Sequence, residues 1–437
     1  MTIKRKIVCL FSSLIWCSNA FANINKDQLI DDLTFLASDE LNGRQTFSAE
    51  IDQAANYIND RFKHIGLTPF NQLTDFKQTF ELTDIAPTSI SVKLNGREIG
   101  SKDIAFAATQ ASVNWQSVDD ITVSVIGADT NFRDALFNAN AMGGQQLLLV
   151  HPAHAPFFSR IQDFLAEGIR TQNANDDAAM VLILTSETKL ETFNIQGTTT
   201  KQQRKLTNVI GVLPGKSKPN EVVIYSAHYD HLGLNPGGEG DVIFNGADDD
   251  ASGTAAVINL AEYFTKQNNN ERTLMFVAFT AEEIGGYGSK YFSEQLDPNS
   301  IVAMINIEMI GKPSKFGAGT IWMTGPDKSD LRTLLNAQLK DKNIEIYPDP
   351  YPEQKLFYRS DNATLARLGV PAHSFSSTQL DKDKYYHSVS DDISSLDLDS
   401  FHLVVEQLAT STLGLSNGSI TPRRVDPANI RPTGKIF

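Results

Sequence analysis

Apolar residues near the start of the chain recur at the spacing of an α-helix. The first stripe consists of three leucines, Leu29, Leu33 and Leu36. A second stripe runs from Ile51 to Ile65 and is followed by Gly66 and Pro69, two residue types that end helices. Because apolar residues three and four positions apart share one face of a helix, the pattern predicts two helices with buried faces.

The pattern changes between about Ile85 and Gln202, where short β-prone runs are separated by polar loops. These runs are residues 90–92, 121–125, 146–150 and 180–184. Such runs between polar segments are typical of strands. We therefore expect an inserted β-rich or mixed subdomain, and we find no chemical motif in it.

From Asn208 onward, continuous apolar runs of strand length alternate with helical segments. The expected strands are residues 222–225, 274–279, 301–307 and 370–375, and the expected helices are residues 255–264 and 401–413. Continuous apolar strands separated by helices imply a largely parallel sheet that is covered on both faces. The sequence therefore predicts an α/β fold with a mixed, largely parallel central sheet flanked by helices, an α/β/α sandwich that carries the inserted subdomain.

The first 22 residues have the pattern of a secretory signal peptide. Basic residues 4–6 precede an apolar run that reaches Trp16, and Ala20-Phe21-Ala22 has the small residues of a cleavage site. The apolar stretch is shorter than the ~20 residues that a membrane span needs. We expect cleavage after Ala22 and an exported protein, periplasmic or secreted, without stable membrane association.

Composition narrows the chemistry that the exported chain can use. Hydrophobic residues make up 41% of the 437 residues and charged residues 21%, which is ordinary globular usage. Both cysteines lie within residues 1–22, so disulfides and thiolate metal ligands are excluded from the remaining 415 residues. Those residues hold 35 basic and 52 acidic side chains, a net charge of −17. A chain this acidic is a poor candidate for binding nucleic acid or anionic membranes.

Side chains that can bind metal ions follow the predicted strands. His228 ends the first strand, and Asp230 is placed to accept a hydrogen bond from its other ring nitrogen and fix the tautomer. Residues 246–253 form a tight acidic turn that opens a helix. Three consecutive aspartates lack the spacing of a calcium-binding loop. A middle carboxylate aimed between two cations explains the turn better, and Asp249 is that residue.

The later strands and loops add further candidates. The second strand ends in Glu282 and Glu283, and a metal-bound glutamate beside a free one allows coordination and proton transfer to be divided between them. Glu308 closes the third strand, and His387 follows in a later loop. Ligands bind at the carboxyl edge of an open α/β sheet, so the shared position adds weight to the residue types. For His231, which lies nearby, a packing role is expected.

These motifs resemble the co-catalytic di-zinc exopeptidases. The resemblance rests on residues 228–230, the turn 246–253, the pair Glu282-Glu283 and residues 386–389. Residues 36–44 are also similar to the segment that opens many bacterial members. The family includes secreted bacterial leucine aminopeptidases, glutamate carboxypeptidase, glutaminyl cyclases and the transferrin receptor ectodomain. The similarity covers residues ~30–67 and ~205–415 and fades over the insert, which in this family is often a protease-associated domain.

The resemblance implies two zinc ions. Carried over to this chain, His228 and Glu308 bind one zinc ion, and Glu283 and His387 bind the other. Asp249 bridges them. One departure concerns Glu308, because many relatives have an aspartate there, which is one methylene shorter.

The resemblance also implies the catalytic roles. Glu282 is the general base, and Tyr386 matches a tyrosine near the substrate carbonyl that helps to stabilise the oxyanion. A cis peptide bond is implied between Asp249 and Asp250. A second departure is Asn362, which stands where many relatives have histidine.

The expected function is that of a zinc aminopeptidase acting on peptides. Two zinc ions ~3.5–4 Å apart share a water whose pKa falls toward ~7, Glu282 takes its proton, and the hydroxide attacks the scissile carbonyl. Glu282 then returns the proton to the leaving amine. The expected segments are a signal peptide (1–22), a helical part of the catalytic domain (23–85), the insert (86–202), the metallopeptidase catalytic domain (203–418) and a C-terminal tail (419–437).

Three other functions stay open. A glutaminyl cyclase of the same fold works with one zinc ion, whereas five ligands favour two. A carboxypeptidase needs basic residues for the substrate carboxylate, and Arg359 is the one nearby candidate. A non-catalytic binding module would resemble the transferrin receptor. Such proteins typically lose metal ligands, and none is missing here.

Overall fold

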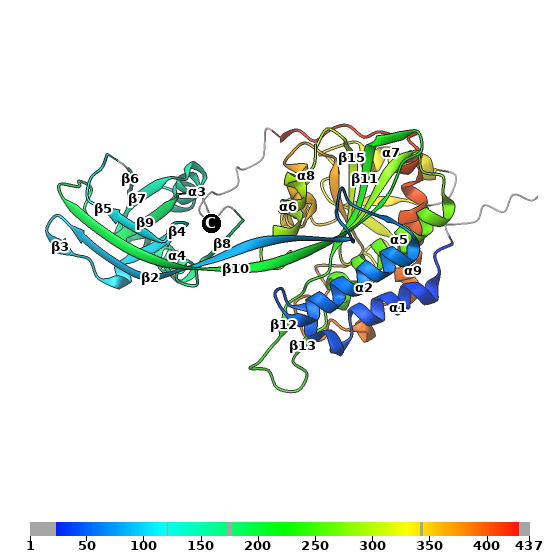
Figure 1. The fold of residues 1–437 in the computed structure, drawn as a ribbon, viewed down its shortest axis with the longest axis horizontal. Helices are drawn as coiled ribbons and strands as arrows, with labels where there is room; N and C mark the ends of the chain where they lie inside the picture. The colour runs from blue at the N-terminus through cyan, green and yellow to red at the C-terminus, as the bar shows by residue number, and fades with distance from the viewer. Residues whose placement is uncertain (1–22, 120, 173–176, 341–343, 428–437) are drawn as a thin grey trace, which may run out of the picture.

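The computed structural model describes residues 23–119, 121–172, 177–340 and 344–427. A large body built on a central sheet is joined to a smaller body by a long two-stranded ribbon (Figure 1). The ribbon consists of β2 (Lys77–Leu94) and β10 (Phe193–Leu213), which pair antiparallel along the whole length of β2. The expected signal peptide lies outside the described residues. Among the helices that are described, none has the length and apolar character that crossing a membrane requires.

The central sheet is built around four parallel strands, β11 (Lys218–His228), β14 (Arg272–Phe279), β15 (Ile301–Ile307) and β18 (Ala372–Ser376). β11 lies between β14 and β15, and β18 pairs with the other side of β15. β10 and β16 (Ile321–Met323) extend the sheet antiparallel at its two sides, and β17 (Ile346–Pro348) follows β16. The prediction of a mixed, largely parallel sheet is confirmed.

Helices cover both faces of this sheet. On one face, Val223 and Tyr225 of β11 join a core with α1 (Lys26–Leu36), α2 (Ala49–Ile65), α5 (Gly253–Gln267) and α9 (Leu398–Ser411). These four helices gather on one side of the large body in Figure 1. On the other face, Val222 and Ile224 pack with α6 (Tyr287–Glu294) and α8 (Asn362–Ala366). Since neighbouring strand residues point to opposite faces, two buried faces explain the continuous apolar runs.

The two helices predicted near the start of the chain are α1 and α2. The Asn25 side chain caps α1 by accepting a hydrogen bond from the amide of Gln28, and Ser48 caps α2 in the same way. α2 ends at Gly66, whose φ of +89° favours glycine. A 3₁₀ turn, Asp39–Arg44, connects the helices and brings Arg44 into the interior.

The smaller body contains a four-stranded sheet and two helices. The strand order is β4 (Ile104–Ala108), β9 (Ala179–Leu184), β7 (Gln145–Val150) and β6 (Thr122–Ile126), with α3 (Phe132–Met142) and α4 (Ala155–Ala166) packed on it. Three of the predicted β-prone runs are strands of this sheet, and residues 90–92 belong to β2. The expected boundaries after residues 85 and 202 fall inside the ribbon strands.

The end of the described chain lies against the large body. Ile420 and Val425 are buried, and the backbone oxygen of Ile420 accepts a hydrogen bond from Arg272. Arg424 donates in turn to the backbone oxygen of Ile301. The first part of the expected tail is therefore packed on the body.

Candidate metal centre

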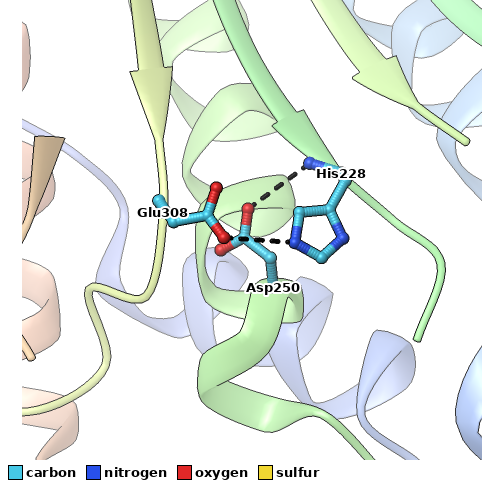
Figure 2. Close-up of side chains that lie close together, drawn as sticks. All are labelled: His228, Asp250 and Glu308. Carbon is cyan, nitrogen blue, oxygen red and sulfur yellow. Dashed lines mark hydrogen bonds and ion pairs between the residues drawn. The ribbon is translucent and has the colours of Figure 1, made fainter. Parts of the chain in front are cut away.

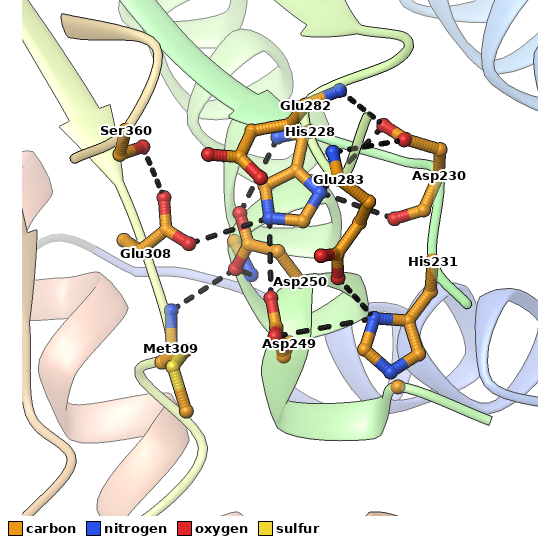
Figure 3. A network of polar contacts seen from close by, with 12 residues as sticks. His228, Asp230, His231, Asp249, Asp250, Glu282, Glu283, Glu308, Met309 and Ser360 are labelled. Atoms are coloured by element: carbon orange, nitrogen blue, oxygen red, sulfur yellow. Dashed lines mark hydrogen bonds and ion pairs between the residues drawn. The ribbon is translucent and has the colours of Figure 1, made fainter. Parts of the chain in front are cut away.

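Three parallel strands deliver polar side chains to one edge of the central sheet. β11 ends at His228, which pairs in register with Phe279, the last residue of β14. Glu282 and Glu283 follow β14 within four residues, and Glu308 directly follows β15. The acidic turn, Ala247–Ser252, leads into α5 at the same edge. Side chains that are 80 residues apart in the sequence therefore meet in one small volume (Figure 3).

His228 faces two carboxylates with one ring nitrogen. Its Nε2 lies 3.2 Å from Asp249 Oδ1 and 3.3 Å from Glu308 Oε1. Its Nδ1 lies 3.1 Å from the backbone oxygen of Asp230. Because a carbonyl oxygen can only accept, Nδ1 carries the proton, and the lone pair of a neutral ring then points at two negative oxygens. Only a cation between these atoms, a proton or a metal ion, makes that arrangement favourable.

His387 faces a second pair of carboxylates. Its Nε2 lies 3.3 Å from Asp249 Oδ2 and 3.2 Å from Glu283 Oε2. Asp249 thus directs one carboxylate oxygen at each histidine, and its side chain is 3% exposed. The five expected metal ligands are brought together in two groups that share Asp249. Imidazole nitrogens and carboxylate oxygens are the donors from which zinc sites without cysteine are built, so the residues fit this metal.

Asp250 lies close to the first group but is engaged differently. Its carboxylate, with His228 and Glu308, forms a group whose ligand atoms lie within 4.8 Å of one another (Figure 2). Asp250 Oδ1, however, accepts hydrogen bonds from the amides of Gly253 and Met309, at 3.0 and 3.1 Å. Asp249 faces histidines alone and is better placed to bridge. The expected cis peptide bond between Asp249 and Asp250 is present.

His231 contacts the second group, so its expected role in packing alone is wrong. Its Nδ1 lies 2.7 Å from Glu283 Oε1, and its ring is fully buried. His231, Asp249 and Glu283 also form a group that could hold a metal ion. The signal in the sequence was a second histidine three residues after His228 at a strand end. Neither the two-residue period of a strand nor the 3.6-residue period of a helix predicts where the His231 side chain points, because His231 lies beyond the end of the strand.

Asp230 supports the site in a different way from the one expected. The backbone oxygen of Asp230, and not its carboxylate, is hydrogen-bonded to His228; the carboxylate oxygen lies 3.8 Å from Nδ1. The carboxylate instead accepts hydrogen bonds from the amides of Glu282 and Glu283, at 3.1 and 3.3 Å. Asp230 therefore fixes both the ring of His228 and the backbone of the glutamate pair.

Burial and charge give the site residues distinct protonation behaviour. Burial alone would lower the pKa of His228, but the charge of Glu308 and a hydrogen bond to Asp249 raise it well above its usual value. Hydrogen bonds to Asp249 and Glu283 raise the pKa of His387 to about 10. Burial opposes ionisation of Asp249, yet its bonds to the two histidines hold its pKa well below the usual range. Without metal, these histidines therefore carry protons that a metal ion would replace.

Glu282 lies beside these residues without a partner for its carboxylate. In the part of the chain that the structure describes, that carboxylate makes no hydrogen bond. Burial raises the pKa of Glu282 well above its usual value, and the charges of Glu308 and Asp361 act in the same direction. For Glu283, hydrogen bonds from His231 and His387 outweigh burial and lower the pKa. The pKa values of the two adjacent glutamates are therefore shifted in opposite directions.

The two departures from the family pattern have distinct surroundings. Glu308 Oε2 accepts a hydrogen bond of 2.5 Å from the Ser360 hydroxyl, which holds the longer side chain in place. Asn362 is buried, and its amide donates to the backbone oxygens of Phe357 and Ala372. Its amide oxygen accepts a hydrogen bond from the Ser374 hydroxyl, so Asn362 ties α8 to β18.

A cavity of about 370 Å³ opens next to the candidate metal ligands. Its walls include Glu308, Met309, Trp322, Leu356 and Leu380. Arg359, Lys384 and Tyr386 also line the cavity. The Tyr386 ring stacks on the ring of His387, with 3.9 Å between centroids, and is 45% exposed.

Comparison with known proteins identifies a family match and sequence relatives. Residues 208–412 match the model of peptidase family M28. Leucine aminopeptidase 1 of Neurospora crassa is 27% identical over 202 residues, which are 44% of this chain and 49% of that protein. A probable zinc metalloprotease of Pyrenophora teres f. teres is 36% identical over 118 residues, 26% of this chain and 24% of that protein. The chain thus spans between a quarter and a half of the length of these relatives.

Solved structures share the fold. An aminopeptidase from Aneurinibacillus sp. strain AM-1 gives a TM-score of 0.54 at 18% identity, over 93% of this chain and 97% of that one. A zinc aminopeptidase from Bacillus subtilis gives 0.54 at 14% identity, over 95% and 100% of the two chains. Residues 208–412 thus match peptidase family M28, the leucine aminopeptidase relative supports the resemblance to the co-catalytic zinc exopeptidases, and the solved structures show a shared fold.

Proposed function

We propose that this protein is an exported, zinc-dependent aminopeptidase that removes N-terminal residues from peptides. The observation that carries the proposal is the position of Asp249 between two histidine–carboxylate pairs, with the unpartnered Glu282 beside them. The family of residues 208–412 and the zinc aminopeptidases that share the fold support the same reading.

The chain offers ligands for two metal ions. His228 and Glu308 would hold one zinc ion, Glu283 and His387 would hold the other, and Asp249 would contact both. Bound zinc ions would polarise the scissile carbonyl and make water acidic enough to serve as a nucleophile at neutral pH. His231 and Asp230 would keep the ligands oriented, because each is hydrogen-bonded to a member of the glutamate pair.

Glu282 would move the proton. Its carboxylate is free of other hydrogen bonds and has a raised pKa, which suits a group that takes a proton from the attacking water. The same carboxyl would then give this proton to the leaving amine. Tyr386 lines the cavity with its ring stacked on His387, so its hydroxyl could donate to the oxyanion.

The site also suits an N-terminal residue as substrate. The free α-ammonium of a peptide would be attracted by the excess of carboxylates around the metal centre. The side chain of the first residue would enter the cavity of about 370 Å³, where Met309, Trp322 and Leu356 supply apolar walls. We expect a preference for large apolar residues at this position.

A panel of aminoacyl chromogenic substrates tests the proposal, with N-blocked versions of the same compounds as controls. Rapid hydrolysis of free-amine substrates, loss of activity with a chelator and recovery with zinc are the expected results. Equal rates on blocked and free substrates would remove the aminopeptidase claim. Full activity after complete removal of metal would remove the metal mechanism.

One observation favours a carboxypeptidase as second candidate. Arg359 and Lys384 both line the cavity, and neither makes an ion pair with another described residue. Two free cations could bind the carboxylate of a peptide C-terminus. Peptides with free and amidated C-termini distinguish the two functions, because only a carboxypeptidase loses its substrate on amidation. A zinc count of one per chain, with cyclisation of N-terminal glutamine, would indicate a glutaminyl cyclase instead.

Export and segment organisation belong to the same proposal. Residues 1–22 would direct export and be removed, so the protein isolated from the periplasm or medium should begin at Asn23. Residues 86–202 would form an inserted subdomain on the catalytic domain, attached through the β2–β10 ribbon. An intact mass that includes residues 1–22 would contradict the cleavage.

A further inference from the structure

Residues 43–46 contact two loops that lie next to candidate metal ligands, the loop after His228 and the loop before Asp249. Arg44 is 1% exposed and is among the largest fully buried side chains of the described chain. Its Nε donates to the backbone oxygen of Tyr229 at 2.8 Å, and its Nη2 donates to that of Gly246 at 3.0 Å. Its Nη1 donates to the backbone oxygens of Asn245, at 2.6 Å, and Leu36.

These acceptors belong to three different segments. Tyr229 directly follows the candidate ligand His228, and Gly246 precedes Asp249 by three residues. Leu36 is the last residue of α1. One guanidinium therefore links the end of α1 to the loop that follows His228 and to the turn that carries Asp249.

The neighbours of Arg44 make further contacts with the same loops. The backbone oxygen of Arg44 accepts a hydrogen bond from the amide of His231 at 3.2 Å. The Thr46 hydroxyl donates to Asp230 Oδ2 at 3.0 Å. Asp230 in turn holds the amides of the glutamate pair, so the segment also reaches the second metal group.

Gly43 allows the close approach of this segment. Its φ is +71°, in the region that favours glycine. A Cβ atom at this position would lie 2.4 Å from the backbone oxygen of Phe244 and 2.5 Å from that of Gly233. Any other residue would push the segment away from the loops.

Among the described residues, no carboxylate makes an ion pair with Arg44. The four hydrogen bonds of its guanidinium all end on carbonyl oxygens, and the charges of nearby aspartates, Asp230 first among them, also favour the cation. Burial lowers the pKa of Arg44 to about 10, so the side chain is charged at neutral pH. If the loops moved apart, a buried cation would lose its acceptors, which is strongly unfavourable.

We propose that residues 43–46 form a clamp that holds together the loop of residues 229–231 and the loop of residues 245–249. Arg44 is the positioning residue of this clamp and keeps the two loops at the separation needed for zinc binding. The inference rests on the proposed metal site but not on the substrate. The hydrogen bonds that the Arg44 guanidinium makes in the described chain all go to backbone oxygens, so its effect on metal affinity would pass through the backbone of the loops.

The test is the zinc affinity of the mature protein and of Arg44→Met, measured by competition with a chromophoric chelator after metal removal. Loss of an outer support of this kind lowers metal affinity by roughly 10- to 100-fold, and we expect a loss in that range. Arg44→Lys, which keeps the charge but not the planar fork, should fall between the two.

Arg272→Met is the matched control. Arg272 is also 1% exposed and donates to two backbone oxygens, those of Leu415 and Ile420, but it begins β14 at the edge opposite the metal site. Its substitution should lower the unfolding midpoint and leave zinc affinity unchanged. Equal losses of zinc affinity in both variants would overturn the clamp, because general destabilisation would then explain them.

Thr46→Val keeps the inference testable should Arg44→Met not fold. The variant removes one hydroxyl at nearly constant volume and should weaken zinc binding several-fold. Wild-type zinc affinity in every folded variant of this segment would refute the proposal. The peptidase proposal is tested separately, by peptide cleavage. A wild-type protein that binds zinc but cleaves no peptide would contradict the peptidase proposal and not the clamp.

Discussion

The adjacent residues Glu282 and Glu283 differ in their surroundings. Burial raises the pKa of Glu282, whereas hydrogen bonds from two histidines lower that of Glu283. Two carboxylates whose environments push their pKa values apart are suited to different tasks, one to proton transfer and one to charge stabilisation. Sequence alone could name the pair, but their assignment depended on a resemblance, because the histidines that separate them lie far away in the chain.

Glu282→Gln tests that division. The substitution keeps the size of the side chain but removes its basicity, so kcat should fall by about 10²- to 10⁴-fold while the zinc content stays at the wild-type value. Glu283→Ala should instead lose metal. Steady-state kinetics and elemental analysis of the purified variants measure both effects. Normal turnover by Glu282→Gln would contradict the role of that residue.

His373 gives a prediction for stability. Its ring is buried between the Ser329 hydroxyl and the backbone oxygen of Thr324, and burial lowers its pKa to about 4. In the unfolded chain, His373 binds a proton below pH ~6.5, whereas in the folded chain it does so only near pH 4. The free energy of unfolding is therefore unaffected by His373 above pH ~6.5 and falls as the pH drops toward 4. The full effect is about 3 kcal/mol.

Urea unfolding at pH 7 and pH 4.5 measures this contribution. The pH-dependent loss should be smaller in His373→Gln than in the wild type, whereas the exposed His64→Gln should behave as the wild type. The same loss in all three proteins would show that other groups cause it.

At the scale of elements, one lysine joins the acidic turn to the loop of His387. Lys312 Nζ lies 3.2 Å from Asp248 Oδ2 in the turn. It also lies 3.2 Å from Asp383 Oδ1 and 3.5 Å from Asp391 Oδ1, which flank His387 in the sequence. Asp391 in addition accepts from the amide of Asp249 at 3.1 Å. The sequence could not reveal this link, because Lys312 is 64 to 79 residues away from its three carboxylate partners and shares no motif with them.

Lys312→Met should therefore be strongly destabilising. Removal of the cation leaves these buried carboxylates without a positive counter-charge, which costs about 3–5 kcal/mol. Lys266→Met is the control, because Lys266 pairs with Glu262 at the surface and such pairs contribute at most about 1 kcal/mol. Denaturant unfolding compares the two. Equal effects would mean that the Lys312 network does not hold these elements together.

At the scale of the whole molecule, much of the central sheet was predictable and the connection to the insert was not. The apolar runs of residues 274–279 and 301–307 fall within β14 and β15, because strands buried on both faces have no polar positions to blur the pattern. The ribbon strands β2 and β10 are 18 and 21 residues long and pass through both bodies. Buried and exposed residues are mixed along both strands, so the sequence pattern does not indicate where one body ends and the other begins.

Metal uptake should couple to protons over the whole site. Hydrogen bonds to carboxylates raise the pKa of His387 to about 10, and that of His228 is also raised, so both rings are protonated without metal. Because zinc binds neutral imidazole, binding should release on the order of two protons at neutral pH, and affinity should rise with pH. Calorimetry in buffers of different ionisation enthalpy measures the release. Zinc binding without proton release would contradict these protonation states.

Anomalous diffraction at the zinc edge, from crystals of the zinc-loaded protein, tests whether Asp249 lies between two zinc ions. We expect two peaks, one on either side of the Asp249 carboxylate. One should lie between His228 and Glu308, and the other between Glu283 and His387. A single peak, or metal held by Asp250 with Asp249 turned away, would contradict this arrangement.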